Sequence, residues 1–206
     1  IDFWTGAFLI VILTGVYTVL GGLKAVVITE TIQAIILLIG ASATLIYGLN
    51  AVGGWNQMVA TASPGFMNIW KPSDHPDFPW TGVIFGAPIL GIWYWCTDQN
   101  IVQRVLSAKN VSEARKGTIF AGFLKLTPLF LFVIPGVIAF CLTQPGVPEN
   151  VRLDLTSKDS ALPELVKTLL PSGLKGMVGA ALLAALMSSL ASVFNSASTL
   201  VTLDIY

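Results

Sequence analysis

The stretch GAPILGIWYWCTDQNIVQR, residues 86–104, joins an apolar run to an aromatic group and then to a polar cluster. The aromatic group is Trp-Tyr-Trp at 93–95, and Thr-Asp-Gln-Asn follows at 97–100. Pro88 removes a backbone donor and the glycines on either side of it lower helix propensity, so the helix is weakened just before the aromatic group. Such a segment does not face one uniform solvent along its length. We therefore expect a discontinuous helix whose aromatic and polar groups line a cavity.

The composition around this stretch is that of a membrane protein. The chain has 206 residues, of which 54% are hydrophobic and only 11% are charged, and its mean hydropathy is +0.78. Soluble domains carry roughly 25% charged residues, so a soluble globular class is excluded. The formal net charge is zero, which gives no indication of a nucleic-acid partner. In a bilayer, the discontinuous helix fits the pattern of secondary transporters, whereas an interfacial aromatic belt would place these rings nearer the end of a span.

Five apolar stretches are long enough to cross about 30 Å of hydrocarbon as helices, which takes about 20 residues. They lie at 3–21, 26–50, 82–103, 117–142 and 176–203. The predicted fold class is therefore an all-α membrane protein, a single transmembrane domain with about five spans and the lipid bilayer as its solvent. The chain begins without Met and ends directly after an apolar run. We expect an internal piece of a longer protein, whose remaining helices are its partners.

The loops between these spans predict the orientation. The short loop 104–117 holds four Lys or Arg and one Glu, and the turn between the first two spans adds Lys24. The long connections, 51–81 and 143–175, mix both signs of charge. By the positive-inside rule the short loops are cytoplasmic, so the chain starts outside and ends inside.

One of the long connections also predicts a helix of its own. The sequence SALPELVKTLLPSGLKG, residues 160–176, has the pattern of a short amphipathic helix on the outer face. We expect it to end at Pro171 and Gly173. It either takes part in gating or is a plain surface helix.

Three ionisable residues fall inside the predicted spans, where a charge costs roughly 2.5–3.5 kcal/mol on insertion scales. They are Glu30, Asp98 and Lys125, and each needs water, a partner or a ligand. Glu30 is either an interfacial carboxylate paired with Lys24 or an anionic residue on the path of a cation to the cytoplasm. Lys125 either snorkels to the interface or lines a cavity, because Pro128 interrupts the helix three residues further on.

The fifth span carries a stripe of small and polar residues on one helical face. Its members, at positions i, i+3, i+4, i+7 and i+11, are Ala185, Ser188, Ser189, Ser192 and Ser196. Small residues of this kind mediate close helix packing, and their hydroxyls can also hold a small hard cation, which takes oxygen ligands. Sodium fits this chemistry, and the stripe has no acidic residue that favours calcium or magnesium. The two cysteines, Cys96 and Cys141, have no C-x-x-C or His neighbour, so neither a disulfide nor a cysteine metal site is predicted.

Three segments resemble the sodium/solute symporter family, specifically its sodium–glucose cotransporter branch and the bacterial sodium/galactose transporters within it. They are WYWCTDQNIVQRVLSAKN (93–110), MSSLASVFNSASTLVTLDIY (187–206) and GGLKAVVITETIQ (21–33). The resemblance implies a LeuT-type inverted-repeat core of ten helices, in which the five spans are core helices four to eight. It also implies symport of sodium and a sugar into the cell by alternating access, in the plasma membrane and with no enzyme activity.

The resemblance also implies roles for individual residues. Sodium would be held by Ala185, Ser188 and Ser189. The sugar site would include Tyr94, which closes it from the cytoplasmic side, its neighbour Trp95, the lysine Lys125 that bonds the sugar, and Gly91. Glu30 would lie on the sodium exit path, and we group Asp98 with it as a candidate for the ion path or for coupling.

Some positions depart from the family pattern. Gly91 stands where relatives have a side chain that hydrogen-bonds a sugar hydroxyl, which leaves the identity of the sugar open. Ala191 replaces a threonine of members that bind a second sodium, so one sodium per cycle is expected. Glu30 replaces the usual aspartate. The loop 143–175 lacks the cysteine cluster of animal members, which favours a bacterial relative.

The sequence leaves other functions open. Within the transporter class, the solute could be an inositol, an amino acid or a carboxylate. The chain could also be the membrane domain of a transporter-like sensor, or part of a sodium channel. We find no nucleophile–base set, phosphate loop or metal-ligand spacing, so an enzyme is the least favoured class.

Overall fold

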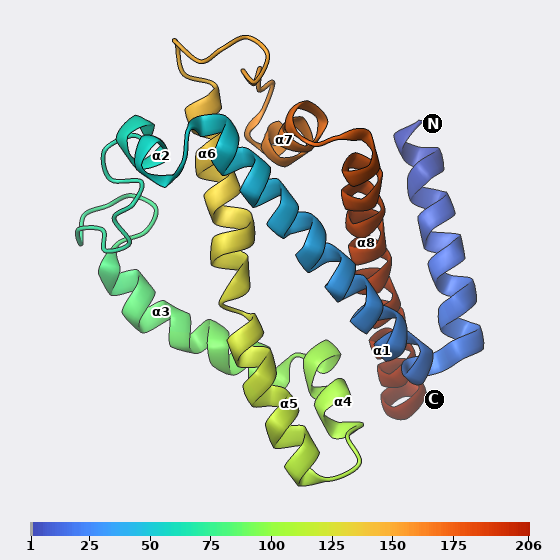
Figure 1. Cartoon of the computed structure of the whole chain (residues 1–206). Helices are drawn as coiled ribbons and strands as arrows, with labels where there is room; N and C mark the ends of the chain where they lie inside the picture. Colours follow the sequence, from blue (N-terminus) through green and yellow to red (C-terminus); the bar gives the residue numbers. More distant parts are fainter. Residues whose placement is uncertain (1) are drawn as a thin grey trace. The chain divides into compact units, whose positions relative to one another are not determined.

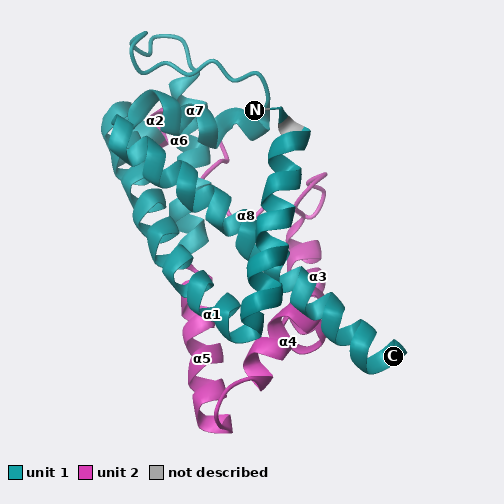
Figure 2. Ribbon diagram, turned by 90° about the vertical axis from the view of Figure 1, so that its right-hand side faces the viewer, with its two compact units in different colours: residues 1–58, 127–206 teal, residues 59–126 magenta. Residues whose placement is uncertain are grey.

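The computed structural model describes residues 2–206, and in this range every regular element is a helix. The predicted all-α membrane fold is thereby confirmed. The helices form two compact units, one made of residues 1–58 and 127–206 and the other of residues 59–126 (Figure 2). We call them unit 1 and unit 2 and describe each by itself.

Three helical stretches in the described part of the chain are long and apolar enough to cross a membrane. They are Trp4–Val52, Val111–Leu142 and Ser172–Ile205. The first contains both of the predicted spans 3–21 and 26–50. The predicted span 82–103 is not among the three, since it is divided into shorter pieces. The five-span topology itself stays a prediction.

Unit 1 begins with α1, Phe3–Val52, which is two helices joined at a break. The Asp2 side chain caps its start by accepting from the Trp4 N–H. At Gly22 the backbone leaves the helical region, with φ 57° and ψ −166°, a combination open to glycine and strained for other residues. The chain reverses direction there (Figure 1). We call the parts before and after Gly22 the first and second arms of α1.

The core of unit 1 is the packing of α8, Ser172–Leu200, against α1, and α6, Ile134–Leu142, packs against α1 as well. Glycines in the second arm allow this close approach. A Cβ on Gly40 would lie 3.0 Å from Cγ2 of Val178, and one on Gly48 would lie 3.1 Å from Cγ2 of Ile138. Small residues are the usual means of close packing in membrane helices, where lipid provides no hydrophobic drive.

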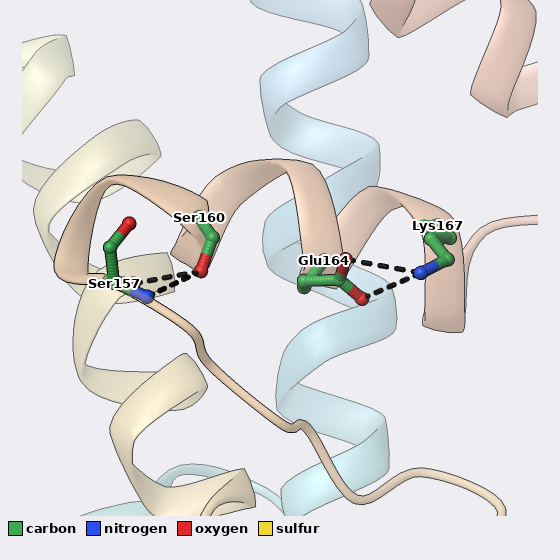
Figure 3. Close-up of polar contacts among 4 residues, drawn as sticks. All are labelled: Ser157, Ser160, Glu164 and Lys167. Carbon is green, nitrogen blue, oxygen red and sulfur yellow. Dashed lines mark hydrogen bonds and ion pairs between the residues drawn. The ribbon is translucent and has the colours of Figure 1, made fainter.

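The amphipathic helix predicted in the second long connection is α7, Ala161–Leu169. Figure 3 shows its polar side: Ser157 and Ser160 bond to each other before the helix, and Lys167 lies 3.1 Å from Glu164. Leu165 is buried on the opposite side. The helix stops before Pro171 as predicted, but the expectation that Gly173 helps to end it is wrong. Gly173 lies in the first turn of α8, because Pro171 is itself the N-cap of that helix.

Unit 2 holds the stretch quoted at the outset. It comprises the end of α2, Trp55–Thr61, then α3, Trp80–Ile92, the π-helical turn Trp93–Thr97, α4, Gln99–Leu106, and α5, Val111–Leu124. Pro88 lies inside α3 without ending it. The discontinuity comes ten residues later, at Asp98, whose φ of −68° and ψ of 113° are extended. The helix therefore passes its proline and breaks after the wide turn that carries the aromatic group.

Candidate functional site

The first candidate site lies in unit 1, between the second arm of α1 and the middle of α8. There the carboxylate oxygen Oε1 of Glu30 accepts hydrogen bonds from the hydroxyls of Ser188, at 2.9 Å, and Ser192, at 2.8 Å. These serines are 158 and 162 residues away from Glu30 in the chain. The structure thus joins two predicted site residues, Glu30 and Ser188, and adds Ser192 to them.

The helical register of α8 explains why both serines reach one carboxylate. Ser188 and Ser192 are four residues apart and lie on one face, and the Ser192 hydroxyl also contacts the Ser188 carbonyl oxygen at 2.9 Å. The face is turned toward the protein, since Ser192 and Ser196 are both buried. The serine stripe therefore packs against α1 and at the same time holds a charged group. The packing interpretation is thereby confirmed, whereas binding of a cation by these hydroxyls stays a prediction.

The first arm of α1 is also bonded to α8 near this point. The Tyr17 hydroxyl donates to the backbone carbonyl of Met187 at 3.2 Å. Both arms are therefore held to the same turn of α8.

The other two predicted sodium residues lie on the same turn of α8. The Ser189 hydroxyl donates to the Ala185 carbonyl oxygen at 3.1 Å, and Ser189 is exposed. Both are oxygen groups of the kind that a hard cation accepts. In residues 2–206 no group of three or more His, Cys, Asp or Glu side chains is placed to hold a metal ion. A cation here would rely on hydroxyls and carbonyls, and these residues suit sodium better than a transition metal.

The second candidate site lies in unit 2, around the aromatic group. The rings of Tyr94 and Trp95 are 5.3 Å apart and nearly perpendicular, with an interplanar angle of 81°. The ammonium nitrogen of Lys125 lies 3.3 Å from the centre of the Tyr94 ring and 5.4 Å from that of Trp95. Both distances are within the range of a cation–π contact. Three of the four predicted sugar residues are therefore in mutual contact.

These residues line an open cavity of about 260 Å³. Its lining residues are Leu90, Gly91, Trp93, Tyr94, Trp95 and Lys125. A Cβ on Gly91 would meet no atom within 4 Å, so this residue adds room to the cavity and no hydrogen-bonding group. The fourth predicted sugar residue thus lies at the same cavity as the other three.

A break in the helix places Lys125 at this cavity. α5 ends at Leu124, and Lys125 is its C-cap, with its N–H bonded to the Ala121 carbonyl at 3.0 Å. The predicted interruption before Pro128 is thus observed. Of the two roles open to Lys125, the structure favours cavity lining over snorkelling, because its ammonium group lies over the ring of Tyr94. The contact joins the C-cap of α5 to the π-helical turn; the family resemblance placed these residues at one site, but no pattern in the residues alone indicates a cation–π contact.

Asp98 has a local structural role. Its side chain accepts the Asn100 N–H at 2.9 Å and so caps the start of α4, as Asp does at many helix N-termini. It belongs to unit 2 and Glu30 belongs to unit 1. A role for Asp98 in the ion path stays a prediction.

Glu30 and Ser188 are polar side chains that bond to each other between two long apolar helices, which is the pattern of a helical membrane protein. A family model, the sodium:solute symporter family, matches residues 1–206, and the chain belongs to that family. This confirms the family predicted from the three motifs. With the membrane-length helices, it also confirms a multi-pass protein of the cell membrane.

Individual relatives are similar along nearly the whole chain. Sodium/glucose cotransporter 1 of Ovis aries is 38% identical over 236 residues, which cover 100% of this chain and 36% of the relative. Sodium/myo-inositol cotransporter 2 of Homo sapiens is 42% identical over 219 residues, covering 94% of this chain and 32% of the relative. The chain thus spans about a third of the length of these relatives. Their names describe cotransporters and not enzymes.

Proposed function

We propose that the protein is a sodium-coupled symporter of a sugar such as glucose or galactose, which it carries into the cell by alternating access. The observation that carries the proposal is membership of the sodium:solute symporter family over residues 1–206. An inositol is the second candidate solute, because a sodium/myo-inositol cotransporter is 42% identical. Both kinds of solute are neutral six-membered rings that carry several hydroxyls; the sugar ring contains one oxygen and the inositol ring only carbon.

The sodium ion would bind beside the turn of α8 that carries Ala185, Ser188 and Ser189. A serine hydroxyl has one proton to donate and two lone pairs. Since Ser188 donates its proton to Glu30, its lone pairs remain to face a cation. The negative charge of Glu30 would further favour a cation there. Glu30 then holds the ligand in the right orientation and receives the ion as it leaves toward the cytoplasm.

The sugar would bind at the cavity in unit 2. One apolar face of the ring would pack on Tyr94 and Trp95, and the ammonium of Lys125 would donate to a hydroxyl. Gly91 gives room for the ring. Because it has no polar side chain, it forms no hydrogen bond that would select one arrangement of hydroxyls on the solute. Tyr94 would then yield to open the site toward the cytoplasm.

Coupling requires that sodium bind more tightly to the conformation in which the sugar site is formed. The proposal is that one sodium enters with each solute, down its gradient. No chemical step on the solute is implied, in keeping with relatives that are named as cotransporters.

The test is sodium-driven uptake by the full-length protein in proteoliposomes, with glucose, galactose, myo-inositol and proline as separate solutes. We expect one polyhydroxylated solute to accumulate only with an inward sodium gradient. Ser189→Ala should raise the sodium concentration needed for half-maximal uptake, whereas Ser198→Ala, an exposed serine on the same helix, should not.

Uptake of proline alone would overturn the sugar claim. Sodium flux that does not depend on solute would indicate a channel, and no movement of any solute would favour a sensor.

A further inference from the structure

The ammonium of Lys125 already occupies the aromatic face on which a solute would pack. From this contact we infer that Lys125 determines specificity by charge: it excludes cationic solutes from the aromatic cavity and leaves the cavity open to neutral polyhydroxylated ones. The inference rests on the proposed function, because it assigns the substrate class of the same site. It concerns what the site rejects, which a hydrogen bond from Lys125 to a sugar does not explain.

The geometry makes the lysine an internal substitute for a cationic ligand. An aromatic ring attracts a cation placed over its face within about 6 Å of its centre. Lys125 lies at 3.3 Å from the Tyr94 centre and at 5.4 Å from the Trp95 centre. The one ammonium group is therefore within cation–π distance of both rings. Without it, a Tyr–Trp pair at an open cavity is the chemistry of a site that binds organic cations.

The charge balance of the cavity points the same way. Among the six residues that line it, Lys125 alone is charged, and no carboxylate is present to offset it. A second positive charge entering the cavity would meet a like charge at short range and be repelled by it. A neutral solute does not meet this repulsion, and its hydroxyl oxygens can accept hydrogen bonds from the ammonium.

Lys125 can exchange its contact with the Tyr94 ring for a hydrogen bond to a solute hydroxyl. Its side chain is exposed and flexible, and it begins at a residue where the helix has already ended. When a polyol enters, the ammonium can leave the Tyr94 ring for a hydroxyl and free the ring face for the apolar side of the solute. A protonated amine on the solute offers no acceptor for that exchange.

The experiment compares glucose with glucosamine, at a pH low enough to protonate the amine of glucosamine. Binding to the purified full-length protein is followed by intrinsic tryptophan fluorescence, since Trp93 and Trp95 line the cavity, and competition is measured against sodium-driven uptake. In Lys125→Met, the affinity for glucosamine relative to glucose should rise at least about tenfold, or about 1.4 kcal/mol. Lys125→Arg keeps the charge and should keep the exclusion.

Two further variants keep the result interpretable. Lys109→Met removes a lysine from the turn between α4 and α5, away from the cavity lining, and should leave the relative affinity unchanged. Tyr94→Leu added to Lys125→Met should abolish the gain, because the aromatic face is then gone. The inference is overturned if Lys125→Met leaves the glucosamine-to-glucose ratio unchanged, or if Lys109→Met changes it equally.

The proposed function can fail separately. If no variant shows sodium-driven uptake of any sugar, the symport proposal falls, while the fluorescence measurement still decides whether Lys125 excludes the cation. If sugar uptake is present and the ratio does not change, the transport proposal stands and the inference falls.

Discussion

At the scale of single residues, Glu30 shows how an ionisable group is accommodated in an apolar helix. One of its oxygens receives two serine hydroxyls from α8, and hydrogen bonds to a charged acceptor are stronger than neutral ones. The sequence predicted that the carboxylate needed a partner or a ligand. It could not predict which partner, since the serines lie more than 150 residues away and helix periodicity describes only one helix at a time.

We expect Glu30→Gln to weaken sodium binding. The amide still accepts a hydrogen bond, but the negative charge that favours a cation beside Ser188 is lost. Two opposite unit charges about 4 Å apart attract by about 1 kcal/mol in water and more near a protein surface, so the apparent sodium affinity should fall at least about fivefold. The sodium dependence of uptake measures this.

Two variants control the Glu30 prediction. Glu30→Asp keeps the charge and should retain most of the affinity, whereas Glu149→Gln, at an exposed residue of the loop between α6 and α7, should have no effect. An unchanged sodium dependence in Glu30→Gln would remove the carboxylate from the proposed ion path.

At the scale of helices, the sequence indicated the position of two breaks and not that of a third. The turn between the first two spans and the interruption near Pro128 lie where glycine and proline indicate them. The break in residues 86–104 does not, because Pro88 lies within α3 and the chain continues into a π-helical turn. That turn closes with the Asp98 N–H bonded to the Trp93 carbonyl at 3.0 Å, a wide geometry that no residue type in the sequence indicates.

We expect Gly40→Leu to destabilise unit 1. Even the first side-chain carbon would lie 3.0 Å from Val178 on α8, so a leucine forces the helices apart at a cost of about 1–3 kcal/mol. Gly179→Leu is the matched control, because it lies on α8 next to Val178 and its Cβ would meet nothing within 4 Å. Both changes raise helix propensity equally. We expect the midpoint temperature of thermal unfolding, measured in detergent, to fall for Gly40→Leu and not for Gly179→Leu. Equal midpoint temperatures for the two variants would contradict the close packing of α1 on α8.

At the scale of the whole molecule, each unit holds one candidate site. The residues proposed to bind sodium lie in unit 1, and the aromatic cavity lies in unit 2. Family and fold class could be predicted from composition and three motifs. The grouping of residues 1–58 with 127–206 could not, since it depends on contacts between distant segments.

If the two sites are coupled as proposed, their effects on each other must be equal. We expect saturating sodium to raise solute affinity, and saturating solute to raise sodium affinity by the same factor, because linkage is reciprocal for binding free energies. Typical coupling is about 5- to 150-fold. Equilibrium binding of each ligand with and without the other measures both factors. Unequal factors would show that more than one sodium or a further ligand takes part.

The distance along the chain between Glu30 and its serines has a consequence for biosynthesis. Glu30 is made 158 residues before Ser188, an interval of roughly ten to thirty seconds at 5–20 residues per second. Throughout that time the second arm of α1 carries a carboxyl group into the membrane with its final partners not yet synthesised. Until α8 is made, the cost of placing this ionisable group in the bilayer is not offset by the two serine hydroxyls that bond it in the folded protein.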